Sequence, residues 1–130
     1  MRVILDGVFN HTGSQSVYFN ADGWYPTLGA AQSQDSPWYS WYRFLHWPDS
    51  YDSWWGIHTL PAVEESAPSY VDFIIDGENS IIRRWLRAGA SGWRLHVADE
   101  LPDWFLVKIR AAMEETAPDS VLIGEVWEDG

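Results

Sequence analysis

The chain of 130 residues contains no cysteine, which excludes a disulfide framework and a thiolate metal site. It also lacks any apolar stretch near the roughly 18 residues that a membrane-spanning helix needs. No charged segment followed by an apolar one opens the chain, so no signal peptide is recognisable. Because the first residues already form a strand-like run, we expect an internal piece of a longer protein.

Positive charge is scarce as well. The chain has 8 Lys and Arg residues against 19 Asp and Glu residues, which gives a formal net charge of −11. Nucleic acids and anionic membrane surfaces both require clustered positive charge, so neither is expected as a partner. The acidic excess is instead typical of a well-solvated surface.

Aromatic residues, by contrast, are abundant, with ten Trp, six Tyr and five Phe. A single Trp most often belongs to a core, but aromatic rings also stack on the apolar faces of sugar rings. The tryptophans crowd between Trp24 and Trp55, in a region without a sustained helical or strand period. We therefore interpret this region as a loop that faces a ligand.

Short apolar runs alternate with helical periods along the rest of the chain. Strands are predicted at 2–6, 92–97 and 121–126, where apolar and β-branched residues run together. Helices are predicted at about 78–88 and 102–116, where apolar residues recur at helical spacing. This alternation is typical of right-handed βαβ units with a parallel sheet.

A long irregular segment separates the first strand from the first helix. Prolines and glycines interrupt residues 12–66 repeatedly, so neither helix nor strand extends far there. A loop of this length is uncommon in a compact domain unless it carries function. We expect an inserted subdomain at 12–66, after a strand within 1–11 and before the βα units of 67–130.

Polar side chains gather at the ends of the three predicted strands. They are Asp6, Asn10, His11, Arg94, His96 and Glu125. An eight-stranded βα barrel builds its site from the ends of successive parallel strands, within about 250 residues. We therefore expect the α/β class and a partial (β/α)8 TIM barrel. The four histidines lack the spacing of a metal site, so no metal is predicted.

Three strings at these strand ends carry a family resemblance: DGVFNH at 6–11, GWRLHVAD at 92–99 and GEVWE at 124–128. In this order they resemble signature segments of the alpha-amylase superfamily of alpha-glucan hydrolases and transglycosylases. YDSWWGI at 51–57, with Leu-Pro at 60–61, resembles the neopullulanase, cyclomaltodextrinase and maltogenic-amylase branch. The resemblance implies barrel strands 3–5, with the irregular domain B inserted after strand 3.

The resemblance also implies a chemistry, which is retaining cleavage of alpha-1,4-glucosidic bonds by two carboxyl groups. Glu125 matches the general acid/base, and Arg94 matches the arginine that orients the nucleophile. The implied substrate-side residues are His11, Trp127, Asn10 and Asp6. Of these, Asp6 and Asn10 are expected to shape the strand end rather than to touch the sugar.

The implied partner is an alpha-glucan oligosaccharide or polysaccharide, such as a maltodextrin, a cyclodextrin or pullulan. No cofactor is predicted. In some amylases the position of Asn10 binds calcium, which leaves calcium open for the longer protein without predicting it here. A homodimer is likewise open for the longer protein.

One residue departs from the family pattern, because His96 stands at the position of the nucleophilic aspartate. An imidazole lacks the negative charge that stabilises an oxocarbenium-like transition state, and Asp99 falls on the opposite strand face or past its end. Loss of the nucleophile should cost on the order of 10³ or more in rate. We expect a nearly inactive hydrolase. The alternatives are a carbohydrate-binding pseudoenzyme and a nonfunctional truncated reading frame.

Overall fold

The computed structural model describes residues 1–125, which divide into two compact units. One unit comprises Met1–Phe9 and the chain from Pro68 onward, and the other comprises Asn10–Ala67. No helix within residues 1–125 has the length and apolar character that crossing a membrane requires.

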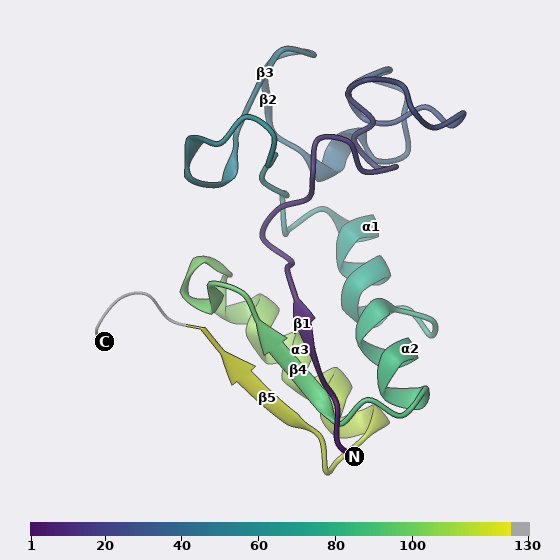
Figure 1. Ribbon diagram of the computed structural model, residues 1–130, viewed down its shortest axis with the longest axis vertical. Helices are drawn as coiled ribbons and strands as arrows, with labels where there is room; N and C mark the ends of the chain where they lie inside the picture. Colours follow the sequence, from purple (N-terminus) through teal and green to yellow (C-terminus); the bar gives the residue numbers. More distant parts are fainter. Residues whose placement is uncertain (126–130) are drawn as a thin grey trace. The chain divides into compact units, whose positions relative to one another are not determined.

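The first unit is built on a parallel three-stranded sheet in the order β1-β4-β5 (Figure 1). The strands are β1 (Ile4–Gly7), β4 (Gly92–Leu95) and β5 (Val121–Gly124). All three predicted strands are therefore present, and their parallel order confirms the predicted α/β class. Each is shorter than predicted at its carboxyl end except β1, which extends one residue further to Gly7.

Helices connect the strands of this sheet. They are α1 (Pro68–Val71), the π-helical turn η3 (Asp72–Asp76), α2 (Ile81–Arg87), the 3-10 turn η4 (Ala98–Glu100) and α3 (Asp103–Thr116). The two predicted helices correspond to α2 and α3. Helix α2 begins later than predicted because the Ser80 side chain accepts a hydrogen bond from the Arg83 backbone N–H and caps the helix. Gly89, at φ +114, follows its end.

The core of the first unit includes one face of α3. Phe105, Ile109, Ala112 and Met113 are buried at helical spacing, whereas Leu106 is half-buried. Helix α3 contacts α2, whose Ile82 and Leu86 are also buried. Burial of these two apolar faces stabilises this unit.

The second unit has little regular structure. Its elements are the 3-10 turns η1 (Tyr39–Trp41) and η2 (Trp54–Gly56) and the antiparallel strands β2 (Phe44–His46) and β3 (Ser50–Tyr51). A cluster of aromatic rings forms its core. The buried ring of Phe19 lies with its centroid 4.8 Å from that of Tyr51 and 5.0 Å from that of Tyr42. Many aromatic residues of this unit thus fill its interior rather than face a ligand.

Candidate functional site

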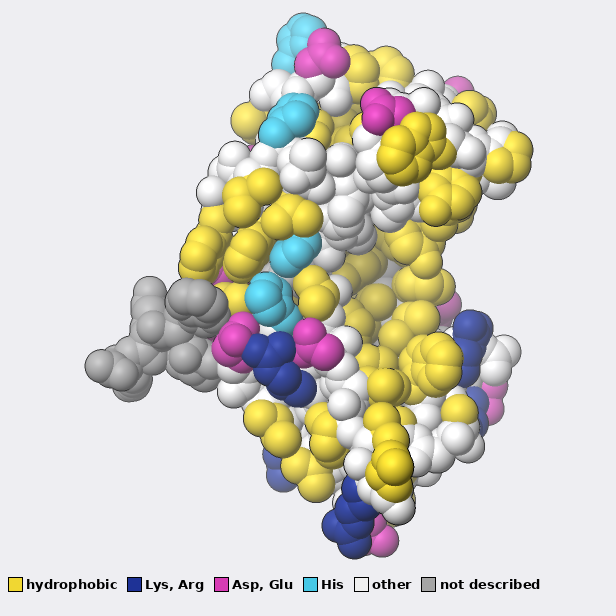
Figure 2. Space-filling model, viewed as in Figure 1, with side chains coloured by type: hydrophobic (Ala, Val, Ile, Leu, Met, Phe, Trp, Pro, Cys, Tyr) yellow, Lys and Arg dark blue, Asp and Glu magenta, His cyan; other side chains and the backbone are white. Residues whose placement is uncertain are grey.

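Arg94 connects all three strands of the parallel sheet. Its Nη1 lies 2.5 Å from Oδ1 of Asp6 on β1, and its Nη2 donates to Oε2 of Glu125 after β5. The strand register explains the first contact, because Asp6 pairs with Arg94. The hydrogen bond to Asp6, followed by the charges of both carboxylates, raises the pKa of Arg94 above its ordinary value. Figure 2 shows acidic side chains on both sides of a basic one.

Glu125 is held through its main chain as well as its side chain. Its backbone N–H donates to the Leu95 carbonyl at 2.9 Å, and its carbonyl accepts from the Ala98 N–H at 2.7 Å. Its Oε1 accepts a hydrogen bond from the Val97 N–H at 3.1 Å. The carboxylate is therefore fixed at the carboxyl edge of the sheet by donors from β4 and from the turn that follows it.

His96 lies directly beside this carboxylate. Its Nδ1 is 3.3 Å from Oε1 of Glu125, and the two side chains are 24% and 26% exposed. Its backbone N–H donates to the Gly7 carbonyl at 2.9 Å, which ties the position to the end of β1. The structure thus brings together the sequence-predicted residues Arg94, His96 and Glu125, with Asp6 beside them.

Val97 is a residue of the candidate site that the sequence did not indicate. It is buried and has the left-handed backbone conformation φ 45, ψ 62, which is rare for a β-branched residue. This conformation ends the strand earlier than predicted and accompanies the N–H bond to Glu125. The contribution comes from the main chain, so no side-chain motif could have indicated it.

Asn10 and His11 belong to the second unit. Asn10 is buried, and its side-chain Oδ1 lies 2.7 Å from Nδ1 of His11. The His11 ring stacks on Trp54, with centroids 4.8 Å apart and an interplanar angle of 26°. The ring of His11 is therefore oriented by Trp54, and its Nδ1 is held by the side chain of Asn10. The remaining predicted site residue, Trp127, lies outside the described residues.

Asp99 is exposed in η4. Among residues 1–125, no group of three His, Cys, Asp or Glu side chains is arranged to hold a metal ion.

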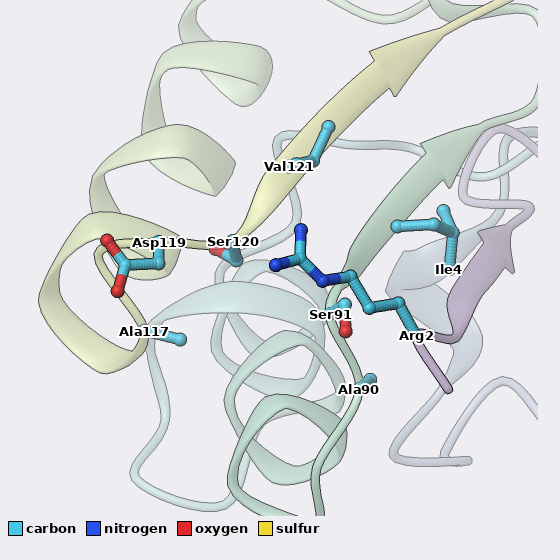
Figure 3. Close-up of a pocket in the computed structure, with 8 residues that line it drawn as sticks. All are labelled: Arg2, Ile4, Ala90, Ser91, Ala117, Asp119, Ser120 and Val121. Atoms are coloured by element: carbon cyan, nitrogen blue, oxygen red, sulfur yellow. The ribbon is translucent and has the colours of Figure 1, made fainter.

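A cavity of about 390 Å³ lies away from Arg94 (Figure 3). Its lining residues Arg2, Ser91 and Val121 stand at the amino ends of β1, β4 and β5. The charged cluster occupies the carboxyl ends of the same strands, where a βα barrel carries its chemistry. This cavity is therefore not a candidate catalytic site.

Comparison with known proteins places these features in context. No family model matches the chain. The amylopullulanase of Thermoanaerobacterium saccharolyticum is 37% identical over 147 residues, which cover 99% of this chain and 11% of that protein. The intracellular maltogenic amylase of Bacillus subtilis is 32% identical, with 98% of this chain and 20% of that protein covered. The curated relatives extend far beyond this chain, which spans between 8% and 22% of their length.

Solved structures agree with these relatives. The debranching enzyme of Nostoc punctiforme matches with a TM-score of 0.82 and 28% identity, over 100% of this chain and 28% of that one. The cyclic alpha-maltosyl-(1→6)-maltose hydrolase of Arthrobacter globiformis matches with a TM-score of 0.83 and 25% identity, over 98% and 28%.

The parallel βα sheet, with its carboxylate and guanidinium cluster at the strand ends, matches part of the (β/α)8 barrel of these solved structures. The chain belongs to the alpha-amylase family. This confirms the family resemblance and the partial barrel that the motifs predict. Amylopullulanases, at 37% and 38% identity, are relatives that the motifs had not indicated.

Proposed function

We propose that the chain contributes barrel strands 3–5 of an alpha-glucan hydrolase in which His96 occupies the nucleophile position. The names of its relatives, among them amylopullulanase, maltogenic amylase and neopullulanase, support an alpha-glucan substrate. In this proposal Glu125 is the general acid/base and Arg94 orients its neighbours. The observation that carries it is the 3.3 Å separation of His96 Nδ1 and Glu125 Oε1.

This arrangement should suppress hydrolysis strongly. Retaining cleavage needs a carboxylate that attacks the anomeric carbon and stabilises positive charge on the sugar. The Nδ1 of His96 is directed at Glu125, and attack by Nε2 would create a cationic adduct in the vicinity of Arg94. Hydrolysis is therefore expected to be lower by on the order of 10³ or more than with aspartate at position 96.

The test is the His96→Asp substitution in the natural polypeptide that carries this chain. We expect kcat/KM for release of reducing ends from maltohexaose and pullulan to rise by about 10³. His46→Asp is the matched control, because it makes the same change at an exposed histidine of β2. Unchanged hydrolysis in His96→Asp, with retained folding by circular dichroism, would refute the assignment of the nucleophile position.

A second candidate is carbohydrate binding without turnover. It is favoured by two tryptophans of the second unit whose side chains face solvent, Trp24 at 70% and Trp55 at 55% exposed. Calorimetric titration of the unaltered polypeptide with maltohexaose should then give binding while product formation stays at background. Light scattering on the same sample shows whether the longer protein forms the homodimer that the sequence leaves open.

A further inference from the structure

A loop of the second unit exposes three large apolar side chains. Trp24, Tyr25 and Leu28 are 70%, 44% and 57% exposed. The surrounding sequence GWYPTLGAAQSQ, at 23–34, contains no charged residue, although the chain as a whole has a net charge of −11. Single apolar side chains are normal on a protein surface, but several within one short loop indicate a surface that binds a partner. The loop 23–28 is therefore a candidate binding surface.

A buried amide fixes the backbone of this loop. Asn20 has no exposed surface, and its Nδ2 lies 3.1 Å from the Tyr25 carbonyl oxygen and 3.0 Å from that of Thr27. Oε1 of Gln32 lies 2.9 Å from the same Nδ2, and Oδ1 of Asn20 accepts from the Tyr25 N–H at 3.2 Å. Breaking any of these bonds would leave a buried polar group unsatisfied, which is costly. The side chain of Trp24 is thus presented from a fixed backbone.

Further hydrogen bonds hold both ends of the loop. The Gly23 N–H donates to the Asn20 carbonyl at 3.2 Å, and the Ser36 hydroxyl donates to the Leu28 carbonyl at 3.0 Å. Loops that a rigid scaffold positions are common places for binding residues. A surface whose backbone is already ordered loses little conformational entropy when a ligand binds. The loop therefore combines exposed apolar side chains with a preorganised main chain.

We propose that the loop 23–28 is a stacking surface for glucosyl rings of an alpha-glucan, with Trp24 as the contact residue and Asn20 as its positioning residue. The inference rests on the proposed function, because it takes the alpha-glucan as the ligand. An indole covers the apolar face of a sugar ring well. An uncharged polysaccharide meets no electrostatic repulsion from this acidic chain, whereas a second copy of the chain would bring the same negative charge again.

The first experiment observes Trp24 directly in the natural polypeptide that carries this chain, with Glu125→Gln to prevent turnover. N-bromosuccinimide oxidises accessible indoles, and mass spectrometry of peptides gives the extent of oxidation at Trp24. Maltohexaose should protect Trp24, and the concentration for half protection gives the Kd of this surface. Glycine suits the left-handed backbone at position 20 (φ 54), so Asn20→Gly removes the amide without adding strain. We expect Kd to rise about fivefold or more in Asn20→Gly.

Leu45→Ala is the matched control for this measurement. It truncates another exposed apolar side chain of the same unit, at 72% exposure, and should leave the protection of Trp24 unchanged. The double variant Asn20→Gly/Trp24→Ala tests whether Asn20 acts through Trp24. It should bind maltohexaose no more weakly than Trp24→Ala alone, because a residue that only positions the indole has no effect once the indole is absent.

The second experiment varies the ring itself. Calorimetric titration with maltohexaose should show that the binding event with the Kd of Trp24 protection weakens about fivefold or more in Trp24→Ala. In Trp24→Tyr, which retains an aromatic face, Kd should stay within about twofold.

Oxidation of Trp24 that maltohexaose does not slow, or equal Kd values for Trp24→Ala and Trp24→Tyr, would overturn the inference. Self-association that Trp24→Ala abolishes, without protection by sugar, would assign the loop to a second copy of the chain instead. Each of these results would leave the proposed function standing, because that function is judged separately by the hydrolysis that His96→Asp restores.

Discussion

Nδ1 of His96 and Oε1 of Glu125 lie 3.3 Å apart, which is direct contact. In retaining glycosidases the two catalytic carboxyl groups stand about 5–5.5 Å apart, so that a glycosidic bond fits between them. The imidazole therefore contacts the predicted proton donor instead of facing it across a sugar. The distance between the side chains at positions 96 and 125 can therefore be measured in variants of position 96.

The His96→Asp variant should widen this gap. Aspartate is shorter than histidine, and its negative charge repels the carboxylate of Glu125. We expect a crystal structure of the variant to show carboxyl oxygens about 5 Å apart, with the bond between Arg94 and Asp6 preserved. Two carboxyl groups still in direct contact would contradict this explanation of the site.

Arg94→Lys tests whether a forked cation is needed. An ammonium group cannot donate simultaneously to Asp6 and Glu125 in the geometry that the guanidinium uses. In a His96→Asp background we expect kcat to fall by about 10²–10³, with a smaller change in KM. Stability should change little, since the Arg94 pairs are partly exposed.

Arg43→Lys provides the comparison for this prediction. Arg43 also bonds two carboxylates, those of Asp52 and Glu64, but it lies in the second unit. The same substitution there should leave kcat unchanged. An equal loss of activity in the two variants would indicate a general structural effect rather than a role of Arg94 in the site.

Tyr42 should make the second unit sensitive to alkaline pH. Burial disfavours its phenolate and raises its pKa from 10.0 to about 12, although the hydrogen bond with Thr12 acts in the opposite direction. An unfolded tyrosine ionises near its ordinary pKa, so the stabilising contribution is complete below pH 10. The free energy of unfolding then decreases by about 1.4 kcal/mol per pH unit as the pH rises towards 12.

Tyr42→Phe should remove this part of the alkaline loss. Ultraviolet absorbance of phenolate, compared between the two proteins, gives the pKa of Tyr42 directly. Hydrogen exchange of amides in residues 10–67 gives the pH dependence of local stability. A Tyr42 that titrates near 10 while the unit remains folded would refute the burial argument.

Phe105→Ala should destabilise the first unit. The Phe105 side chain has no exposed surface and packs in parallel with Tyr70, at 6.2 Å between centroids. Truncation of such a ring typically costs about 3–5 kcal/mol. Native-state hydrogen exchange in α3 measures the loss locally. Val107→Ala, at a 67% exposed position of the same helix, should cost less than about 0.5 kcal/mol.

The sequence predicts the strands and helices of the first unit because apolar periods and capping residues are local signals. It also indicates which polar residues follow each strand. The contact between Asp6 and Arg94, residues 88 positions apart, depends on the register of β1 against β4, which local patterns do not encode. In the same way, the direct contact between His96 and Glu125 follows from the packing of two strand ends.

The second unit shows more clearly what cannot be predicted from the sequence. Its abundance of tryptophan is visible in the sequence, but composition does not separate Trp41, which is buried, from Trp55, which is exposed. The difference arises from long-range packing around Phe19 and from the left-handed turn at Trp55. Neither feature leaves a periodic pattern in the chain.

The hydrogen bond from Val97 to Glu125 is donated by a main-chain N–H and not by the side chain at position 96. Glu125, the proposed proton donor, is thus held partly by main-chain atoms, which a substitution at position 96 does not remove. If position 96 is the nucleophile position, replacement of its side chain leaves these main-chain contacts of Glu125 in place. Recovery of chemistry would then require one altered residue and no rebuilding of the surrounding fold.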